Sequence, residues 1–224
     1  MRTISKAGIS FAAAGLLIAG AAGIGTAATA APSVHLAASS AKIPAPVAAV
    51  PEIFGGNTGV ALDSNFLAAL KSLGLTPSVD GTATLTDGTI KFPITGGSVA
   101  YWSPKGDYRP YVQGILEHDG SGLNLTAGST KVTLANFTVN PGNSKLYGDV
   151  LVNGKVAVTQ AYLFSLHGGT LKPLQVQGND AILTGTTVHV SPDAAKLLNS
   201  TFKTDAVKAG LLVGTATITA QIAQ

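Results

Sequence analysis

The amino-acid sequence predicts a mainly β protein, an antiparallel β-sandwich that carries two short helices. Short runs of alternating apolar and polar residues, separated by turn residues, recur from about residue 54 onward, as in a sandwich or a barrel. Only 11% of the residues are charged, compared with roughly 25% in an average globular protein, and the chain is rich in Gly and Thr. Two segments alone break the alternation, with apolar residues at helical spacing.

The first 30 residues have the three parts of a secretory signal peptide. Arg2 and Lys6 form a short basic region, residues 9–24 form an apolar stretch without charge, and Ala28-Thr29-Ala30 matches an A-x-A cleavage site. We therefore expect a signal peptide over residues 1–30 and a mature protein that is secreted or held at the cell surface. No later segment is apolar enough over a sufficient length to span a bilayer, so we expect no stable membrane insertion after cleavage.

Residues 31–53 are rich in Ala, Pro and Ser and show no apolar periodicity. Pro44, Pro46 and Pro51 favour an extended backbone over a helix. The sequence therefore predicts a flexible arm over residues 31–53, followed by a single β domain over residues 54–224.

Nine segments of this domain have the composition and alternation of strands. Asn153-Gly154, between two of them, is the strongest hairpin signal, since both residues tolerate the positive φ of a type I′ turn. Asp119-Gly120 also predicts a turn. The predicted strands are Gly81–Thr86, Thr89–Phe92, Tyr111–Glu117, Lys131–Val139, Asp149–Val152, Lys155–Gln160, Leu174–Gln177, Thr186–Val190 and Val213–Gln221.

The two predicted helices are Ser64–Leu73 and Pro192–Phe202. Asp63 or the Ser that follows it is a suitable N-cap for the first helix, and Gly74 is a suitable terminator. Ser191 is a suitable N-cap for the second helix. Both helices interrupt a chain that is otherwise typical of strands and turns.

These helices belong to an internal repeat. Val60-Ala61-Leu62 precedes the first helix and Val188-His189-Val190 precedes the second, at an offset of 128 residues. A closing sequence, GTATLT at Gly81 and GTATIT at Gly214, follows each helix. The repeat predicts two strand-helix-strand units in equivalent positions of one β architecture.

Charge and composition exclude several classes of partner. Removal of Arg2 and Lys6 with the signal peptide leaves 12 of the 14 basic residues against 11 acidic ones, a net charge of +1 instead of +3. The basic residues are spread singly, without the patch that phosphate recognition needs, so we expect no nucleic acid partner. The four His residues form no i, i+2 or i, i+4 pair and no calcium-type loop occurs, so we expect no metal site.

One cluster of aromatic residues is a candidate contact surface. Tyr101-Trp102, Tyr108-Arg109 and Tyr111 lie within eleven residues, in a chain that has five Tyr and one Trp, and His118 follows one strand later. Aromatic side chains beside Arg are typical of binding surfaces, because they supply a large amphipathic area at low entropic cost. The predicted ligand-binding residues are therefore Tyr101, Trp102, Tyr108, Arg109, Tyr111 and His118. The alternative is that Tyr101 and Tyr111 cover the open end of a β core.

The sequence shows no catalytic motif. It has no G-x-S-x-G elbow and no Cys, which leaves only Ser and Thr as nucleophiles, and both are common throughout the chain. We expect no enzyme activity. An extracellular hydrolase that acts through carboxylates is an alternative, and it requires Glu117 or Asp119 to line a cleft with another acid.

The segment Gly114 to Gly120, GILEHDG, followed by Leu123-Asn124-Leu125 and the strand Lys131–Val139, is similar to part of the Htaa domain of secreted actinobacterial haem-uptake proteins. The similar part covers roughly residues 92–152. In that family a Tyr ligates the haem iron and a nearby His supports it, so the resemblance implies haem as a ligand and His118 as the supporting residue.

The resemblance has one departure. The ligand Tyr of the Htaa family lies upstream of the sheet, where the corresponding helix of this chain has Phe66 and no Tyr. Tyr101, Tyr108 or Tyr111 would have to replace it in a different geometry. We expect a non-catalytic binding protein whose partner is a small molecule or a cell-envelope component. A haem-binding protein of the Htaa type and a carboxylate-dependent hydrolase are the alternatives, and no cofactor other than haem is implied.

Overall fold

The computed structural model describes residues 43–222. The predicted signal peptide and residues 31–42 of the predicted arm lie outside the described residues. The described part holds the helices α1 (Ser64–Ser72) and α2 (Pro192–Phe202). Its strands are β1 (Ala48–Val50), β2 (Ile53–Leu62), β3 (Thr76–Gly81), β4 (Thr84–Thr86), β5 (Thr89–Pro93), β6 (Gly96–Tyr101), β7 (Val112–Ala127), β8 (Thr130–Asn140), β9 (Lys145–Val152), β10 (Lys155–His167), β11 (Gln175–Gln177), β12 (Asp180–Val190) and β13 (Leu212–Ile222).

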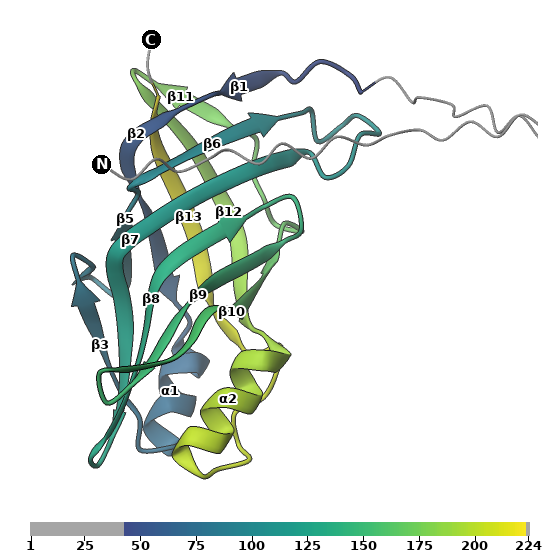
Figure 1. Cartoon of the computed structure of the whole chain (residues 1–224). Coiled ribbons are helices and arrows are strands. Elements are labelled where there is room, and N and C mark those ends of the chain that lie inside the picture. The colour runs from purple at the N-terminus through teal and green to yellow at the C-terminus, as the bar shows by residue number, and fades with distance from the viewer. Residues whose placement is uncertain (1–42, 223–224) are drawn as a thin grey trace, which may run out of the picture. The chain divides into compact units, whose positions relative to one another are not determined.

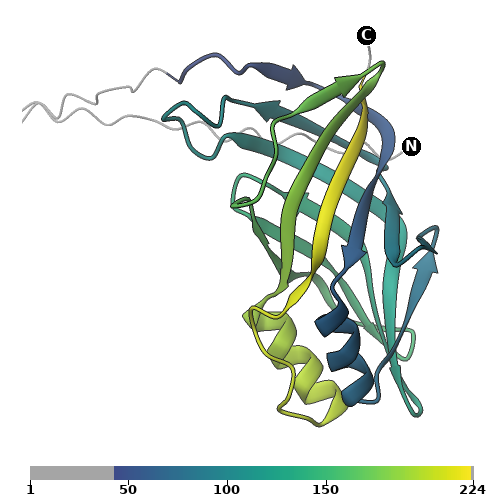
Figure 2. The ribbon, with the colours of Figure 1, turned by 180° about the vertical axis from the view of Figure 1, so that it is seen from behind.

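All of these strands belong to one antiparallel sheet. The strand order is β1-β6-β7-β8-β9-β10-β12-β13-β2-β5-β4, with β11 beside β12 and β3 beside β7. The prediction of a mainly β, antiparallel protein with two helices is confirmed. The two layers expected of a sandwich are two halves of this single sheet, which curls so that β6, β7 and β8 face β12, β13 and β2 (Figures 1 and 2).

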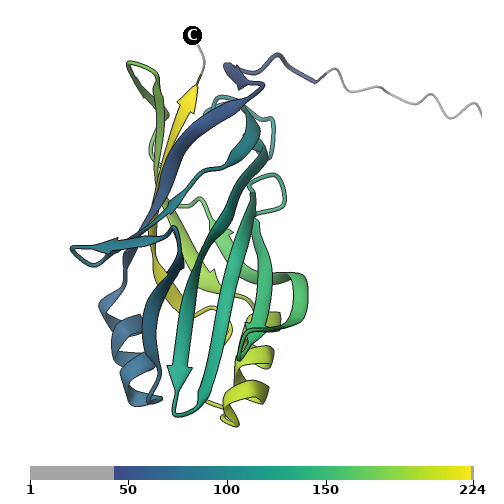
Figure 3. The same cartoon turned by 60° about the vertical axis from the view of Figure 1, so that its left-hand side comes forward.

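The sheet curls along a row of β-bulges that crosses β7, β8, β9 and β10. The pairing register shifts at neighbouring places between each adjacent pair of these four strands. Gly120, Asn136 and Gln160 have positive φ angles there, of 72°, 53° and 48°. Each bulge bends its strand and increases the local twist. A row of bulges therefore folds the sheet across its width, and Figure 3 shows the long β7 and β8 strands that it bends.

The carboxylate of Asp149 links the bulges to one another. It accepts hydrogen bonds from Asn136 Nδ2 and from the backbone N–H of Gln160, both at 2.9 Å. Asn136 Oδ1 in turn accepts from the backbone N–H of Gly120 at 2.9 Å. The turn predicted at Asp119-Gly120 is therefore wrong, because this dipeptide forms a bulge within β7. A Gly with positive φ suits a turn and a bulge equally, and the partner from β8 decides between them.

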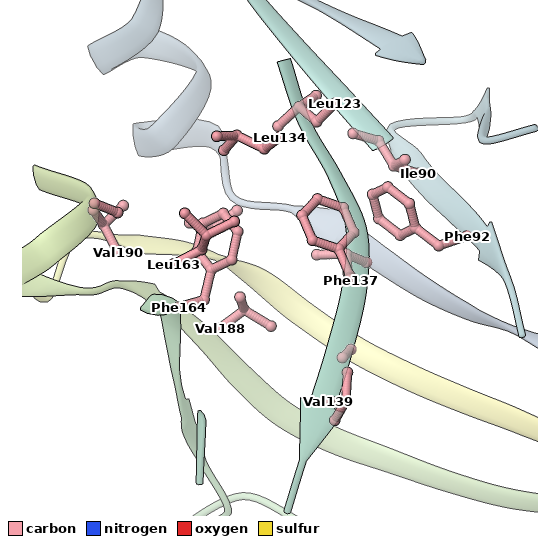
Figure 4. Close-up of a cluster of buried hydrophobic side chains, with 14 of the residues drawn as sticks. Ile90, Phe92, Leu123, Leu134, Phe137, Val139, Leu163, Phe164, Val188 and Val190 are labelled. Atoms are coloured by element: carbon pink, nitrogen blue, oxygen red, sulfur yellow. The ribbon is translucent and has the colours of Figure 1, made fainter. Parts of the chain in front are cut away.

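Apolar side chains fill the half of the curled sheet that lies nearer the helices. Phe137 packs edge to face against Phe92, with ring centroids 5.2 Å apart, and against Phe164 at 6.4 Å (Figure 4). Gly148 makes room for this cluster. A Cβ at Gly148 would lie 2.8 Å from Phe137 Cδ1 and 2.9 Å from the backbone carbonyl oxygen of Ala135, closer than real Cβ contacts, so only Gly fits.

The helices follow two strands that flank β13 on either side. β2 leads into α1 and β12 leads into α2, so both helices lie at the same end of the sheet (Figure 1). Asp63 caps α1 by accepting from the backbone N–H groups of Asn65 and Phe66. Ser191 caps α2 by accepting from Ala194 N–H at 2.9 Å. Neither helix within residues 43–222 is long and apolar enough to cross a membrane.

The closing segments of the internal repeat differ in structure. The second copy, which begins at Gly214, lies wholly within β13. The first copy is divided, because Gly81 ends β3 with a φ of 59° and β4 begins only at Thr84. The predicted strand Gly81–Thr86 is divided in the same way. The strand-helix parts of the repeat thus have matching surroundings on either side of β13, and the closing parts do not.

Other predicted elements agree closely with the structure. Lys131–Val139 lies within β8, Val213–Gln221 lies within β13, and Asn153-Gly154 turns the chain from β9 to β10 with φ angles of 50° and 79°. The sequence does not predict β6 or most of β2, whose glycines weaken the strand pattern. Gly56 is needed in β2, because a Cβ there would lie 2.0 Å from the carbonyl oxygen of Thr219 on β13.

The predicted arm differs in the part that the structure describes. β1 pairs with β6 along the edge of the sheet, and the indole N–H of Trp102 donates to the carbonyl of Pro44 at 2.8 Å. Residues 44–50 are thus held against β6 and Trp102 and do not form a free arm. The Pro residues favour an extended backbone, which an edge strand needs as much as a free arm does.

Candidate ligand-binding site

A cavity of about 470 Å³ lies inside the curled sheet, at the end away from the helices. The first residue of β2, the first half of β12 and the last residues of β13 line it, whereas the helices adjoin the opposite ends of β2 and β12. The volume falls within the roughly 300–1,000 Å³ of typical small-molecule sites. The cavity is therefore large enough to be a binding site and is formed without a partner chain.

The wall of the cavity is almost entirely apolar. It consists mainly of Val, Leu, Ile, Ala, Pro and Gly residues from both halves of the sheet and from the loop between β10 and β11. Arg109 is the only charged residue in the wall, and no Asp or Glu of residues 43–222 lines it. Four residues add hydroxyl groups, namely Tyr101, Tyr111, Ser144 and Thr186.

Three of the predicted site residues meet at the mouth of this cavity. Tyr101 ends β6, and its ring packs edge to face against Tyr111 with centroids 6.3 Å apart. The guanidinium of Arg109 lies over the Tyr111 ring, 5.3 Å from its centroid. A Cβ at Gly168 would lie 3.3 Å from the Tyr111 hydroxyl, so this hydroxyl reaches the loop that follows β10. The predicted cluster thus forms one polar end of an apolar cavity.

The phenol hydroxyls at this end are available to a ligand. Tyr101 is 8% exposed, and no group of the described residues hydrogen-bonds its hydroxyl or that of Tyr111. Arg109 is partly committed, since Nη1 donates to the carbonyls of Gly106 and Tyr108 and Nη2 donates to Pro104. A guanidinium has five N–H groups, so Nε–H and one Nη2–H of Arg109 have no acceptor within residues 43–222.

Trp102 and Tyr108 do not line the cavity. Their rings pack against each other with centroids 4.8 Å apart, and Trp102 is 8% exposed. The indole N–H holds the carbonyl of Pro44, as described above. These two side chains therefore support the loop that carries Arg109 and fix the segment before β1, rather than contact the interior of the sheet.

His118 lies deeper, on β7, and is 1% exposed. Its Nδ1 is 3.2 Å from the backbone carbonyl of Phe137, which can only accept, so Nδ1 carries the hydrogen. Its Nε2 therefore accepts a hydrogen bond from the Thr58 hydroxyl at 2.7 Å. Since Thr58 belongs to β2, this bond joins the two facing halves of the curled sheet.

The surroundings of His118 keep its ring neutral. Burial lowers the pKa of His118 to about 4, although the hydrogen bond with Phe137 and the charge of Asp119 act in the opposite direction. Both ring nitrogens are engaged, so neither has a free lone pair for a ligand. His118 lines a second, smaller chamber of about 70 Å³ and not the large cavity.

The structure gives no support to a carboxylate-dependent hydrolase. Glu117 and Asp119 are exposed, and neither lines either chamber. The described residues also contain no group of three or more His, Asp or Glu side chains that could hold a metal ion. Within residues 43–222, both chambers are therefore lined without a carboxylate.

Sequence reasoning missed the back wall of the cavity. Leu166, Leu183 and Ile218 lie there, on β10, β12 and β13. Alternation along each strand indicates which side chains point inward. It does not indicate at which end the interior stays open, because that depends on how the distant strands curl toward one another.

Comparison with known proteins shows the fold. No protein-family model and no curated protein sequence matches the chain. The structure is similar to the C-terminal domain of HtaA from Corynebacterium glutamicum, with a TM-score of 0.52 and 15% identity over 77% of this chain and 99% of that domain. The N-terminal domain of HtaA from the same organism has a TM-score of 0.51 and 9% identity, over the same shares of the two chains. The resemblance to the Htaa domain is thus confirmed for the fold.

We expect the stability of the protein to depend on pH through His118. The pKa of a His is near 6.5 in an unfolded chain and about 4 for His118 in the folded one, so the unfolded chain binds more protons between these values. The free energy of unfolding therefore falls as the pH drops from 6.5 toward 4, with a loss of about 2 kcal/mol at pH 5 relative to pH 7.5.

Urea unfolding at the two pH values measures this loss. His118→Gln should remove the pH dependence in this window, and His167→Gln, a change at an exposed His, should retain it. The assignment of His118 as a neutral buried residue would be wrong if wild type and His118→Gln lost stability equally on acidification.

Proposed function

We propose that the mature chain is a secreted or cell-surface binding protein without catalytic activity, and that it holds a small, largely apolar molecule inside its curled sheet. The observation that supports this proposal is the cavity of about 470 Å³, whose wall is mostly apolar. Removing apolar surface from water is favourable by roughly 25 cal/mol for each Å². The binding free energy of an apolar ligand in this cavity would therefore be favoured by the burial of the ligand surface and of the cavity wall.

The polar end of the cavity suits the recognition of one polar group on such a ligand. Ligand sites combine mostly apolar walls with a few placed polar groups that fix orientation. Here the Tyr101 and Tyr111 hydroxyls have no partner among the described residues, and Arg109 retains unused donors. The residues predicted from the sequence as a contact surface, Tyr101, Arg109 and Tyr111, therefore take this role.

A variant that fills the cavity should abolish binding of an apolar probe. The fluorescence of the neutral dye N-phenyl-1-naphthylamine should rise saturably with the wild-type protein, because its emission increases in an apolar site. Ala181→Phe places a ring in the wall of the cavity and should weaken binding at least tenfold, which corresponds to about 1.4 kcal/mol. Ala157→Phe, at an exposed position of β10, is the matched control and should bind as wild type does. Equal binding by both variants would place the dye elsewhere.

Haem is a second candidate ligand. The resemblance to the Htaa domain implies it, and this cavity offers two phenol groups, those of Tyr101 and Tyr111, for an iron ion. Phe66 is buried in α1 and has no ligating atom, and His118 is committed to Thr58. The two Tyr residues and Arg109 would therefore hold haem. The chemistry that haem would supply is an iron ion that a phenol oxygen could coordinate.

A haemin titration followed by visible absorbance tests this candidate. If haem is the ligand, the wild-type protein shows a saturable Soret shift that Tyr101→Phe or Tyr111→Phe weakens, since each removes a phenol oxygen. Tyr147→Phe, on β9 and outside both chambers, is the matched control and should leave the shift unchanged. A flat titration, or a shift that neither cavity variant alters, would reject haem at this site.

A further inference from the structure

The large cavity adjoins the smaller chamber around His118. Val139, Leu166, Thr186 and Ile218 line both spaces, so these four residues form a waist between an outer and an inner chamber. The outer chamber measures about 470 Å³ and the inner one about 70 Å³, room for only a few ligand atoms. The free volume of the interior is therefore much smaller on the side of the helices.

The phenol hydroxyls and the guanidinium that are available to a ligand gather at one end of this interior. Tyr101, Arg109 and Tyr111 line the outer chamber only. The inner chamber has three polar residues, Thr58, His118 and Thr186, of which the first two hydrogen-bond each other. A ligand that spans both chambers thus meets a cationic and hydroxylic end at Arg109 and an almost wholly apolar end beyond the waist.

The charge at the outer end is uncompensated within the cavity wall. Among residues 43–222, Arg109 is the only charged residue that lines either chamber, and its contacts at the loop are to backbone carbonyls, which are neutral. Two of its N–H groups remain for an oxygen acceptor. A carboxylate is a ligand group that matches a guanidinium well, because charge-assisted hydrogen bonds between the two are about twice as strong as neutral ones.

We propose that the ligand is a single-chain amphiphile with an anionic head, of the class of long-chain carboxylates. Its carboxylate lies at Arg109 and the Tyr111 hydroxyl, and its alkyl chain runs through the outer chamber toward the waist at Val139 and Ile218. This inference rests on the proposed function, since it names the chemical class that the same cavity binds. The inference separates this class from neutral lipids, which would not use the charge, and from haem, whose rigid ring would remain in the outer chamber.

Competition with N-phenyl-1-naphthylamine tests the head group. The purified chain that begins after residue 30 is titrated with dodecanoate and with dodecan-1-ol, which share a chain and differ in charge. We expect dodecanoate to displace the dye at a concentration at least tenfold lower than dodecan-1-ol. Arg109→Gln should remove this difference, and Arg109→Lys, which keeps the charge, should retain most of it. If dodecanoate and dodecan-1-ol displaced the dye from the wild-type protein at equal concentrations, the inference would be overturned, whatever the variants do.

Chain length tests the direction of the tail. Affinity should rise from octanoate to hexadecanoate in the wild-type protein, as longer chains reach the waist. Ile218→Phe narrows the waist and should weaken hexadecanoate binding at least tenfold more than octanoate binding. Val158→Phe, at an exposed site on β10, should alter the binding of neither. Affinity that does not depend on chain length in wild type would overturn the inference. Failure of the dye itself to bind would instead reject the proposed function on which it rests.

Discussion

The row of bulges across β7, β8, β9 and β10 is the constraint on which the rest of the structure depends. A flat sheet of this width would leave one whole apolar face in water. Asp149 connects the bulges by accepting from Asn136 and Gln160, and the resulting bend brings the apolar faces of the two halves together. The hydrogen bond from Thr58 to His118 then joins the halves across the interior. The enclosed space is packed at one end by Phe92, Phe137 and Phe164 and is open at the other.

This arrangement places the packed core and the proposed binding cavity at opposite ends of the sheet. Near the helices, side chains fill the interior, and His118 satisfies both of its ring nitrogens there. The far end holds the unfilled cavity, which is lined by Tyr101, Arg109 and Tyr111. These side chains keep hydrogen-bond donors that have no acceptor among the described residues. The two ends can differ in this way because the strands are long enough to continue past the packed core. Binding in such a cavity would need little rearrangement of the packed end.

The sequence indicates the chemistry of the site better than its geometry. The aromatic cluster from Tyr101 to Tyr111 was recognisable because aromatic residues are few in this chain, and three members of its set do line the cavity. Trp102 and Tyr108 belong to the same aromatic cluster in the sequence, but they support the loop that carries Arg109. Only their contacts in the structure show this difference. His118 belongs to the segment that resembles the Htaa domain, but its face is set by the register of β7 with β8. A shift of one residue would turn it outward.

The fold was predictable to the extent that it depends on local patterns. Alternation and the Asn153-Gly154 turn define the β8–β9–β10 region, and N-caps define both helices. The curl was not predictable, because it depends on contacts between distant residues such as Asp149 and Asn136. β2 was also not predictable. Gly56 allows β2 to lie close to β13, but a glycine weakens the strand pattern of the sequence.

The central claim is that the interior of the curled sheet receives the ligand, and intermolecular NOE contacts from N-phenyl-1-naphthylamine to protein methyl groups test it most directly. We expect contacts to Val99, Leu183 and Ile218, which line the cavity. Val156 and Val158 are exposed on β10 and should show none. Contacts confined to these two valines, with none to the cavity residues, would contradict it.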